Sequence, residues 1–338
     1  MPQRQGRYVI HLPTAPAVIA WAAAVGKTEN EGPLAGEFDV RYQTDQICPG
    51  SWEMCESRLA EDALGKAFEK SGKNKEDADL LFAGDLLNQC VASTFAARGT
   101  DIPYAGLFGA CSTMALGAAL AALSVDSGAA RLAAACASSH FCSAERQFRF
   151  PLEYGGQKTP TAQRTVTGAG SMLIAQSDGE LPRITNVMFG RIRDQGITDA
   201  NNMGAAMAPA AACTIIDFLR DTGTAPEDYD LILTGDLGKI GSDLLLELML
   251  RREHTDLSRV HNDCGLMIYD LARQDVACGG SGCGCSASVV CSHILNQLRA
   301  GILHRVLYVA TGALMSPTTA QQGENIPAIA HAVEFVKF

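Results

Sequence analysis

Hydrophobic residues along the chain gather in short, almost wholly apolar runs that alternate with longer segments of helical spacing. Such short runs are typical of strands covered on both faces, and they occur at 80–83, 132–137, 231–234 and 306–311. Apolar residues at helix spacing occur at 56–70, 113–125, 208–220 and 287–298. Residues 8–25 are apolar but interrupted by His11, Pro13 and Pro16, so we expect a strand or an extended lead-in to a sheet. Alternating strands and helices predict an α/β protein with parallel strands and right-handed crossovers.

Part of this pattern is repeated. Residues 72–86 read GKNKEDADLLFAGDL and residues 223–237 read GTAPEDYDLILTGDL, with eight identities at one constant offset. Each copy follows a helical segment and supplies a turn and a short buried strand that ends in Gly-Asp. Self-similarity of this kind indicates a duplicated unit.

The segments after each copy also match in kind. A Cys-Ser pair among small residues comes next, at 109–112 (GACS) and 284–286 (GCS), and a helix and another buried strand follow it. We therefore predict two halves, 1–180 and 181–338, that form a layered α-β-α-β-α sandwich. Residues 139–167 have no counterpart in the second half, and we expect them to form an inserted arm suited to a cap or a subunit contact.

Charge and composition narrow the possible partners. The net charge is −10 over 338 residues and no basic run stands out, so nucleic acid is disfavoured as a partner. There is no uninterrupted apolar run of about 18 residues and no clear signal peptide. We expect a protein kept inside the cell, where its 12 cysteines stay reduced.

The first Cys-Ser pair lies where a strand turns into an alanine-rich helix. Cys111 is flanked by small residues in the segment 107–113 (LFGACST). At a helix N-terminus the free N–H groups and the helix dipole favour a thiolate or a bound anion, and nucleophiles are activated on similar bends. The alternative is a buried, inert cysteine, but the duplication and the bend favour a functional position.

Several long strings carry a resemblance to a known family. They are 83–89 (AGDLLNQ), 109–113 (GACST), 138–140 (SSH), 144–149 (AERQFR), 153–158 (EYGGQK), 206–212 (AMAPAAA), 279–287 (GGSGCGCSA) and 329–333 (IAHAV). With its duplicated halves, the chain resembles the thiolase superfamily, which includes thiolases and β-ketoacyl synthases. More narrowly, it resembles the stage V sporulation protein AD family of spore-forming bacteria.

The partners that a thiolase-type enzyme needs around its cysteine are not found. Such enzymes use a histidine together with an asparagine, a histidine or a second cysteine at an oxyanion hole. Here the second-half strand is followed by 235–238 (GDLG), without a histidine, and the glycine-rich loop 279–282 (GGSG) has no asparagine. The positions of a Gly-His-Pro loop and of a late cysteine hold 284–286 (GCS) and 311–313 (TGA). We therefore expect no enzymatic activity, with Cys111 as a vestigial nucleophile.

Two histidines remain as candidates. His140 follows a first-half strand beside the bend, so it is expected to reach the pocket of Cys111, and its alternative role is a structural hydrogen bond. His261 is placed on the surface of the second half.

The resemblance implies a ligand and a setting. The ligand is dipicolinic acid, pyridine-2,6-dicarboxylate, handled with calcium in spores, and no cofactor is implied. The implied partners are the other subunits of the stage V sporulation A membrane complex, at the inner membrane of the forespore and spore, which takes up the compound in sporulation and releases it in germination. A homo-oligomer is possible by analogy with the superfamily.

We predict a binding site for this dianion around the bend and the glycine-rich loop. Its candidate residues are Cys111, Ser112, Asp85, Asn88, Ser139, His140, Asp236, Gly280, Ser281 and Gly282. The positive charge that attracts the dianion would come from Lys239, Arg146 or Arg149. Asp85 and Asp236 would repel a bare dianion, so they either meet calcium or cap the following helices. We expect no metal site in the free protein.

Other interpretations are kept for comparison. The first is a Cys-dependent acyltransferase or condensing enzyme that uses an acyl carrier or coenzyme A. The second is a structural partner of membrane subunits whose pocket is a relic. A zinc site of Cys278, Cys283, Cys285 and Cys291 and a dinucleotide loop at Gly235, Gly238 and Gly241 fit no standard spacing.

Overall fold

The computed structural model describes residues 1–148 and 159–338, and each half forms a five-stranded sheet. The first sheet contains β3 (Ala17–Val25), β9 (Gly168–Ala175), β7 (Leu132–Ser139), β5 (Leu80–Gly84) and β6 (Tyr104–Gly106), in that spatial order. The second contains β10 (Arg183–Met188), β15 (Ala328–Val336), β14 (Arg305–Ala313), β11 (Leu231–Thr234) and β12 (His261–Asp263). The two orders correspond strand for strand, so the sequence repeat is a repeat of whole sheets.

The two sheets touch along one edge of each. One pair of residues, Arg183 of β10 and Ala17 of β3, joins them into a continuous path. The short strands are β1 (Gln3–Gln5), β2 (Val9–His11), β4 (Val40–Arg41), β8 (Arg164–Thr165) and β13 (Gly280–Ser281).

The expectation of purely parallel sheets is wrong. Strands β5, β6 and β7 run parallel to one another, but β9 is antiparallel to both of its neighbours. The second sheet is the same, with β15 antiparallel to β14 and β10. A strand covered on both faces has no polar alternation, so its apolar run does not reveal its direction.

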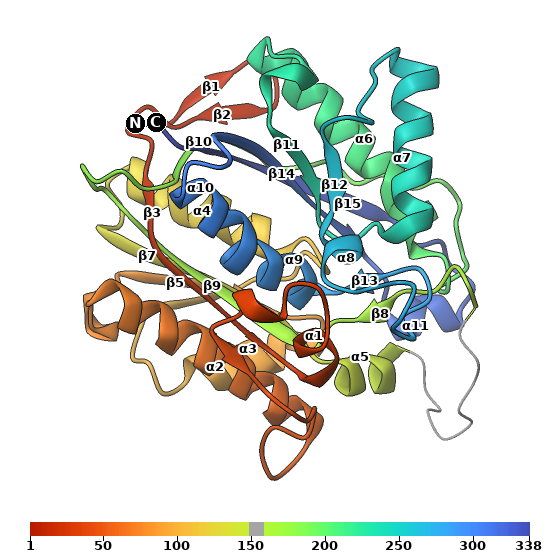
Figure 1. The fold of residues 1–338 in the computed structure, drawn as a ribbon, viewed down its shortest axis with the longest axis horizontal. Helices are drawn as coiled ribbons and strands as arrows, with labels where there is room; N and C mark the ends of the chain where they lie inside the picture. Colours follow the sequence, from red (N-terminus) through yellow and green to blue (C-terminus); the bar gives the residue numbers. More distant parts are fainter. Residues whose placement is uncertain (149–158) are drawn as a thin grey trace.

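Helices form three layers around the sheets (Figure 1). Helices α2 (Trp52–Ser71) and α3 (Val91–Ala97) cover the outer face of the first sheet. Helices α6 (Met203–Thr222) and α7 (Gly238–Glu253) lie outside the second. Between the sheets lie α4 (Thr113–Asp126), α9 (Cys283–Val289) and α10 (Leu295–Arg299), the last two joined by a π-helical turn, Val290–Ile294. The layered α-β-α-β-α arrangement is therefore confirmed.

Small residues let the middle layer pack between two sheets. Helix α4 is rich in alanine and is buried around almost its whole circumference, as expected of a helix covered on every side. Gly170 of β9 allows the backbone of α9 to come close, since a Cβ atom at this position would lie 2.1 Å from the carbonyl oxygen of Ala287. The two halves thus share one core.

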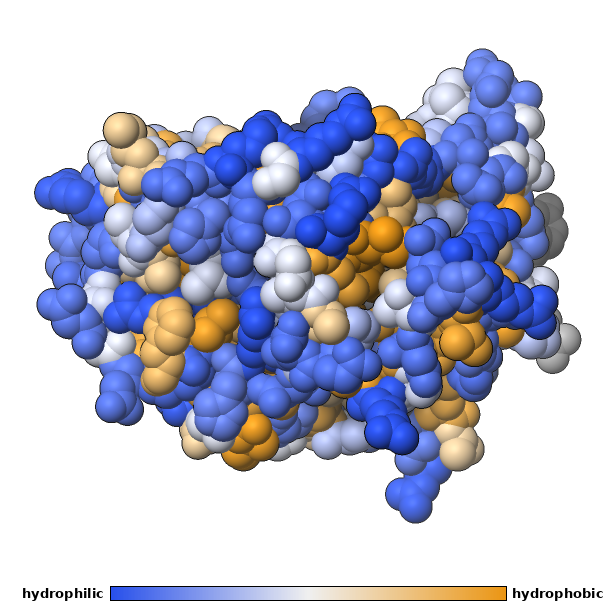
Figure 2. Space-filling model, turned by 90° about the horizontal axis from the view of Figure 1, so that it is seen from above, coloured by the Kyte–Doolittle hydropathy of each residue, from blue (hydrophilic) through white to orange (hydrophobic). Residues whose placement is uncertain are grey.

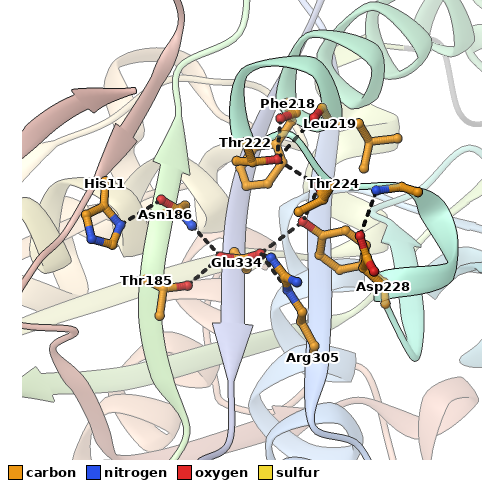
Figure 3. A network of polar contacts seen from close by, with 12 residues as sticks. His11, Thr185, Asn186, Phe218, Leu219, Thr222, Thr224, Asp228, Arg305 and Glu334 are labelled. Carbon is orange, nitrogen blue, oxygen red and sulfur yellow. Dashed lines mark hydrogen bonds and ion pairs between the residues drawn. The ribbon is translucent and has the colours of Figure 1, made fainter. Parts of the chain in front are cut away.

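A buried polar network ties the strands of the second sheet together (Figure 3). Glu334 of β15 accepts hydrogen bonds from Arg305 of β14, at 2.9 and 2.8 Å, and from the hydroxyl of Tyr229, at 2.9 Å. Its other oxygen accepts from Thr185 and Asn186 of β10. A buried carboxylate needs such partners, so the network fixes the register of these strands.

The remaining helices are short, and most lie near the glycine-rich loop. They are α1 (Lys27–Asn30), α5 (Phe141–Phe148), α8 (Cys264–Met267) and α11 (Pro317–Gln321). The predicted arm, 139–167, begins with the last residue of β7, continues through α5 and ends in β8, and its residues 149–158 lie outside the described part of the chain.

Helix α6 meets the length and hydropathy of a membrane-spanning helix, although 67% of that stretch is buried inside the molecule. It is a core helix by its packing on β14 and β15. Seen from above, the surface is mostly hydrophilic, and hydrophobic side chains show in scattered patches, one of them in a central hollow (Figure 2).

Candidate functional site

The predicted bend at Cys111 is present and is held by short-range hydrogen bonds. Ala110 adopts a left-handed conformation with φ of 48°, which is strained for a residue with a side chain. The hydroxyl of Ser112 donates to the carbonyl of Gly109 at 2.6 Å, and that of Thr113 donates to the carbonyl of Ala110 at 2.6 Å. These bonds fix Cys111 just before the first turn of α4.

Cys111 lies at a pocket that both halves build. The pocket encloses about 560 Å³ when the open space at its mouth is counted. Its lining is mostly apolar: Leu86, Phe108, Ala110, Cys111, Ala144, Glu145, Phe148, Gln163, Thr165, Met203, Ser281, Ala313 and Met315. Phe108 is half exposed at 49%.

Polar groups of the second half surround the thiol. The sulphur of Cys111 lies 3.8 Å from the hydroxyl oxygen of Ser281, which donates to the carboxylate of Asp236 at 2.9 Å. Asp236 also accepts from the hydroxyl of Thr311 at 2.7 Å and from the backbone N–H of Gly282 at 3.1 Å. No histidine lines the pocket in the described part of the chain.

Burial and a neighbouring carboxylate determine how readily the Cys111 thiol ionises. Burial raises the pKa of Cys111 well above its usual value, and the negative charge of Asp236 raises it further. Burial also raises the pKa of Asp236. A helix end favours a thiolate by only about 1 kcal/mol, whereas full burial costs a charge several times that amount, so burial outweighs the helix dipole at Cys111.

The backbone N–H groups of the glycine-rich loop, predicted to bind the anion, already donate to groups of the protein itself. The N–H of Gly282 bonds to Asp236, and the N–H of Gly284 bonds to the hydroxyl of Ser139 at 3.0 Å. Ser139 in turn donates to the carbonyl of Val166 at 2.7 Å. Gly280 lies beside them in β13, paired with β8. These residues shape the pocket wall rather than offering it free donors.

Asp85 and Asp236 hold related places in the repeat but have different surroundings. Asp85 accepts from the backbone N–H groups of Leu87 and Ser93, at 2.9 and 2.7 Å, and so caps the first turn of α3. Asp236 makes no such bond to α7, whose first N–H groups donate to Asp263 instead. The structure thus brings Asp236 to Cys111 and keeps Asp85 away from the pocket lining.

The two histidines do not reach the thiol. The Nε2 atom of His140 lies 2.9 Å from the carbonyl oxygen of Asp45, and its Nδ1 accepts from the N–H of Cys142 at 3.1 Å. Both ring nitrogens are therefore occupied, one by the loop that holds Asp45 and the other by the first turn of α5, and His140 is absent from the lining. His261 lies half-buried on β12, 2.9 Å from the hydroxyl of Thr234, and burial lowers its pKa to about 4.

Asn88 and the candidate cations also lie elsewhere. Asn88 is exposed, and its backbone N–H donates to Gln147 at 3.1 Å. Lys239 pairs with Asp243 on α7, and Arg146 pairs with Glu53. Arg149 lies outside the described residues. The described lining therefore contains the carboxylate of Glu145 but no lysine or arginine.

Gln163 and Thr165 are pocket residues that sequence reasoning missed. Gln163 is buried and donates through its amide to the backbone carbonyls of Asp236 and Gly280, the latter at 3.3 Å. Its Oε1 atom has no hydrogen-bond partner among the described residues. Both residues belong to the arm. Thr165 is placed by the pairing of β8 with β13, and Gln163 by a bridge to Ala277 and by its bonds to Asp236 and Gly280. The expectation that the arm suits a cap or a subunit contact was the one available signal.

Metal binding has no support from clustering. Within residues 1–148 and 159–338, no group of three or more His, Cys, Asp or Glu side chains is placed to hold a metal ion.

Comparison with known proteins agrees with the fold. The model of the family "Stage V sporulation protein AD" matches residues 6–336. The protein of that name from Bacillus subtilis (strain 168) is 50% identical over 312 residues, covering 92% of this chain and 91% of the relative.

Solved structures show the same architecture at low identity. The 3-oxoacyl-[acyl-carrier-protein] synthase III of Aquifex aeolicus VF5 has a TM-score of 0.56 at 13% identity, covering 95% of this chain and 99% of the other. Cerulenin-bound OleA of Xanthomonas campestris has a TM-score of 0.60 at 16% identity, covering 99% and 98%. At this identity the likeness concerns the fold alone, which is thiolase-like.

Proposed function

This chain belongs to the stage V sporulation protein AD family, a family of sporulation proteins, and we propose that it acts as a non-enzymatic receptor for dipicolinic acid. The ligand binds in the pocket over Cys111. The protein does so as a peripheral subunit of the stage V sporulation A membrane complex, which takes up the compound in sporulation and releases it in germination.

The observation that carries the proposal is the set of groups around Cys111. The thiol faces a carboxylate and a hydroxyl, and its pKa is raised by burial and by the charge of Asp236. Asp236 is a poor base for this thiol, because its oxygens already accept three hydrogen bonds and a carboxylate holds a proton far less tightly than a thiolate. Nucleophilic catalysis needs an activated thiol, so the site favours binding over chemistry.

The charges at the pocket favour one form of dipicolinate, the calcium chelate, over the free dianion. Glu145 lines the pocket and Asp236 lies directly behind Cys111 and Ser281, while the described lining has no cationic side chain. A free dianion would meet the carboxylate of Asp236 in a partly desolvated space, which is unfavourable. The neutral 1:1 chelate of dipicolinate with calcium avoids this repulsion. We therefore propose that the chelate is the bound species.

Polar contacts are available for orienting it. The Oε1 atom of Gln163 needs a donor or a cation, and the hydroxyl groups of Thr165 and Ser281 lie on the same lining. The apolar side chains of Leu86, Phe148 and Met315 can cover the faces of a planar ring.

Isothermal titration calorimetry with dipicolinate and calcium, added together and separately, tests the proposal. Ala313 lines the pocket, so the larger side chain of Ala313→Leu would fill part of the pocket volume. Ala313→Ser, which leaves the pocket volume almost unchanged, is the matched control. We expect heat of binding with the chelate, lost in Ala313→Leu and kept in Ala313→Ser. No heat with any combination, in a protein shown to be folded, would contradict binding.

The enzymatic alternative is tested separately. The protein is incubated with acyl thioesters of coenzyme A and of an acyl carrier, and its intact mass is measured. We expect an unchanged mass, and an acyl adduct on Cys111 would restore the acyltransferase interpretation.

A further inference from the structure

A second concave site is lined chiefly by α6 and α7, the two helices outside the second sheet (Figure 1). It encloses about 940 Å³, counting its open mouth. Three arginines line it, together with an apolar floor: Arg193, Gln195, Pro209, Ala212, Cys213, Ile216, Asp217, Arg220, Leu248, Arg252 and Glu253. It shares no lining residue with the Cys111 pocket.

Two guanidinium groups meet at Cys213, a residue of the cleft lining. Arg191 and Arg193 each direct an N–H group to the sulphur of Cys213, at 3.1 and 2.7 Å. Arg191 also pairs with Asp217, whose second oxygen pairs with Arg220 at 2.8 Å. The Nε of Arg191 is buried without a hydrogen-bond partner among the described residues.

Positive charge remains after these pairs are formed. Neither Arg193 nor Arg252 has a carboxylate within 4.0 Å in the part of the chain that the structure describes. Asp217 is already held by two arginines, which leaves Glu253, exposed near the end of α7, as the other lining carboxylate. This local excess of arginine stands out in a chain whose net charge is −10.

We propose that this cleft is a binding site for a phosphate group. Guanidinium groups bind phosphate through paired, charge-assisted hydrogen bonds. Several of them can share one tetrahedral oxyanion, whereas a carboxylate is satisfied by a single bidentate arginine. The apolar floor of Ile216, Leu248 and Pro209 would pack against the nonpolar part of a phosphate ester. Inorganic phosphate and a phospholipid headgroup share this chemistry.

The test measures phosphate binding to the full chain by calorimetry and the alkylation rate of Cys213 by peptide mass spectrometry. Cys213 is partly exposed in the cleft and contacts Arg193, so a bound phosphate should slow its alkylation. The variant is Arg193→Gln/Arg252→Gln. The control is Arg98→Gln, an exposed arginine at the end of α3. Vesicles of phosphatidylglycerol and of phosphatidylcholine are the second arm.

We expect inorganic phosphate to bind and to slow the alkylation of Cys213. The double variant should lose about tenfold or more in affinity for phosphate. Arg98→Gln should bind phosphate as the wild type does. Association with phosphatidylglycerol vesicles alone, lost in the double variant, would support the proposal with a lipid source. Absence of both inorganic phosphate binding and cleft-dependent vesicle binding would overturn it, as would equal losses in the double variant and the control. Dipicolinate titrations of the same variants keep the two sites distinct, since the Cys111 pocket does not involve these arginines.

Discussion

Replacing Asp236 by asparagine should make Cys111 more reactive. The substitution keeps the size of the side chain and removes the negative charge next to the thiol. In the wild type, burial and this charge hold the pKa of Cys111 well above its usual value, so very little thiolate is present near neutral pH. Without the charge, the pKa of Cys111 falls and the alkylation rate rises, because the thiolate is the reacting species.

The magnitude follows from the burial of both groups. Cys111 is 6% exposed and Asp236 is 1% exposed. Two unit charges about 4 Å apart at an effective dielectric constant of about 20 interact by ~4 kcal/mol. If only a third of this is realised after the site relaxes, the thiolate population still changes about tenfold. We therefore expect alkylation of Cys111 to be faster by roughly tenfold or more in Asp236→Asn.

The assay follows Cys111 by peptide mass spectrometry during reaction with iodoacetamide at several pH values. Asp236→Asn also gives up acceptor capacity toward Ser281 and Gly282, which costs about 1–3 kcal/mol of stability and could loosen the site. Thr311→Val is the matched control, because it removes a bond to Asp236 of 2.7 Å without changing the charge.

The rate should rise in Asp236→Asn and change little in Thr311→Val. Equal acceleration in both variants would show that loosening, not charge, controls the thiol. No acceleration in Asp236→Asn would refute the electrostatic reasoning.

Three further predictions concern stability. Glu334→Gln should lower the free energy of unfolding by roughly 2–4 kcal/mol in urea titrations, because it leaves the buried partners of Glu334 with a weaker acceptor; an unchanged midpoint would contradict this. Burial raises the pKa of Glu29 from 4.5 to about 7, so between these pH values the folded state keeps a proton that the unfolded state releases. The free energy of unfolding should therefore fall by about 3 kcal/mol as pH rises from 4.5 to 7. Glu29→Gln should remove this dependence of stability on pH, and a pH profile identical to that of the wild type would count against it. Gly84→Ala should destabilise more than Gly235→Ala, because the added Cβ lies 1.9 Å from the carbonyl oxygen of Leu107 in the first case and at least 3.0 Å from any atom in the second; equal losses would be inconsistent with this packing.

The fold was largely predictable because the same order of apolar strands and helices occurs in both halves of the sequence. The run 231–234 is β11 as predicted, and the runs at 80–83 and 132–137 extend only slightly to form β5 and β7. The helices between the sheets were found from apolar residues at helix spacing, and the first of them, 113–125, is also rich in alanine. Strand direction was missed, since β9 and β15 are buried on both faces and have no alternation to indicate how they run.

The site was predictable only where local sequence determines geometry. The bend at Cys111 and the contact with Ser281 follow from short motifs in the two halves. The position of Asp236 beside the thiol depends on how the halves face each other, so its difference from Asp85 was not visible in the repeat. Gln163 lies just before β8 and is held at the pocket by a bridge to Ala277 and by hydrogen bonds to Asp236 and Gly280. No local sequence pattern predicts such long-range contacts.

The central claim is that the pocket over Cys111 binds its ligand without reacting with it. A crystal structure of the protein soaked with calcium and dipicolinate tests this most directly. The account predicts density for an intact chelate in the pocket, against Ser281 and within contact of an unmodified Cys111. Ligand found only elsewhere, for instance in the cleft of Arg193 and Arg252, or a covalent bond to the Cys111 sulphur, would contradict it.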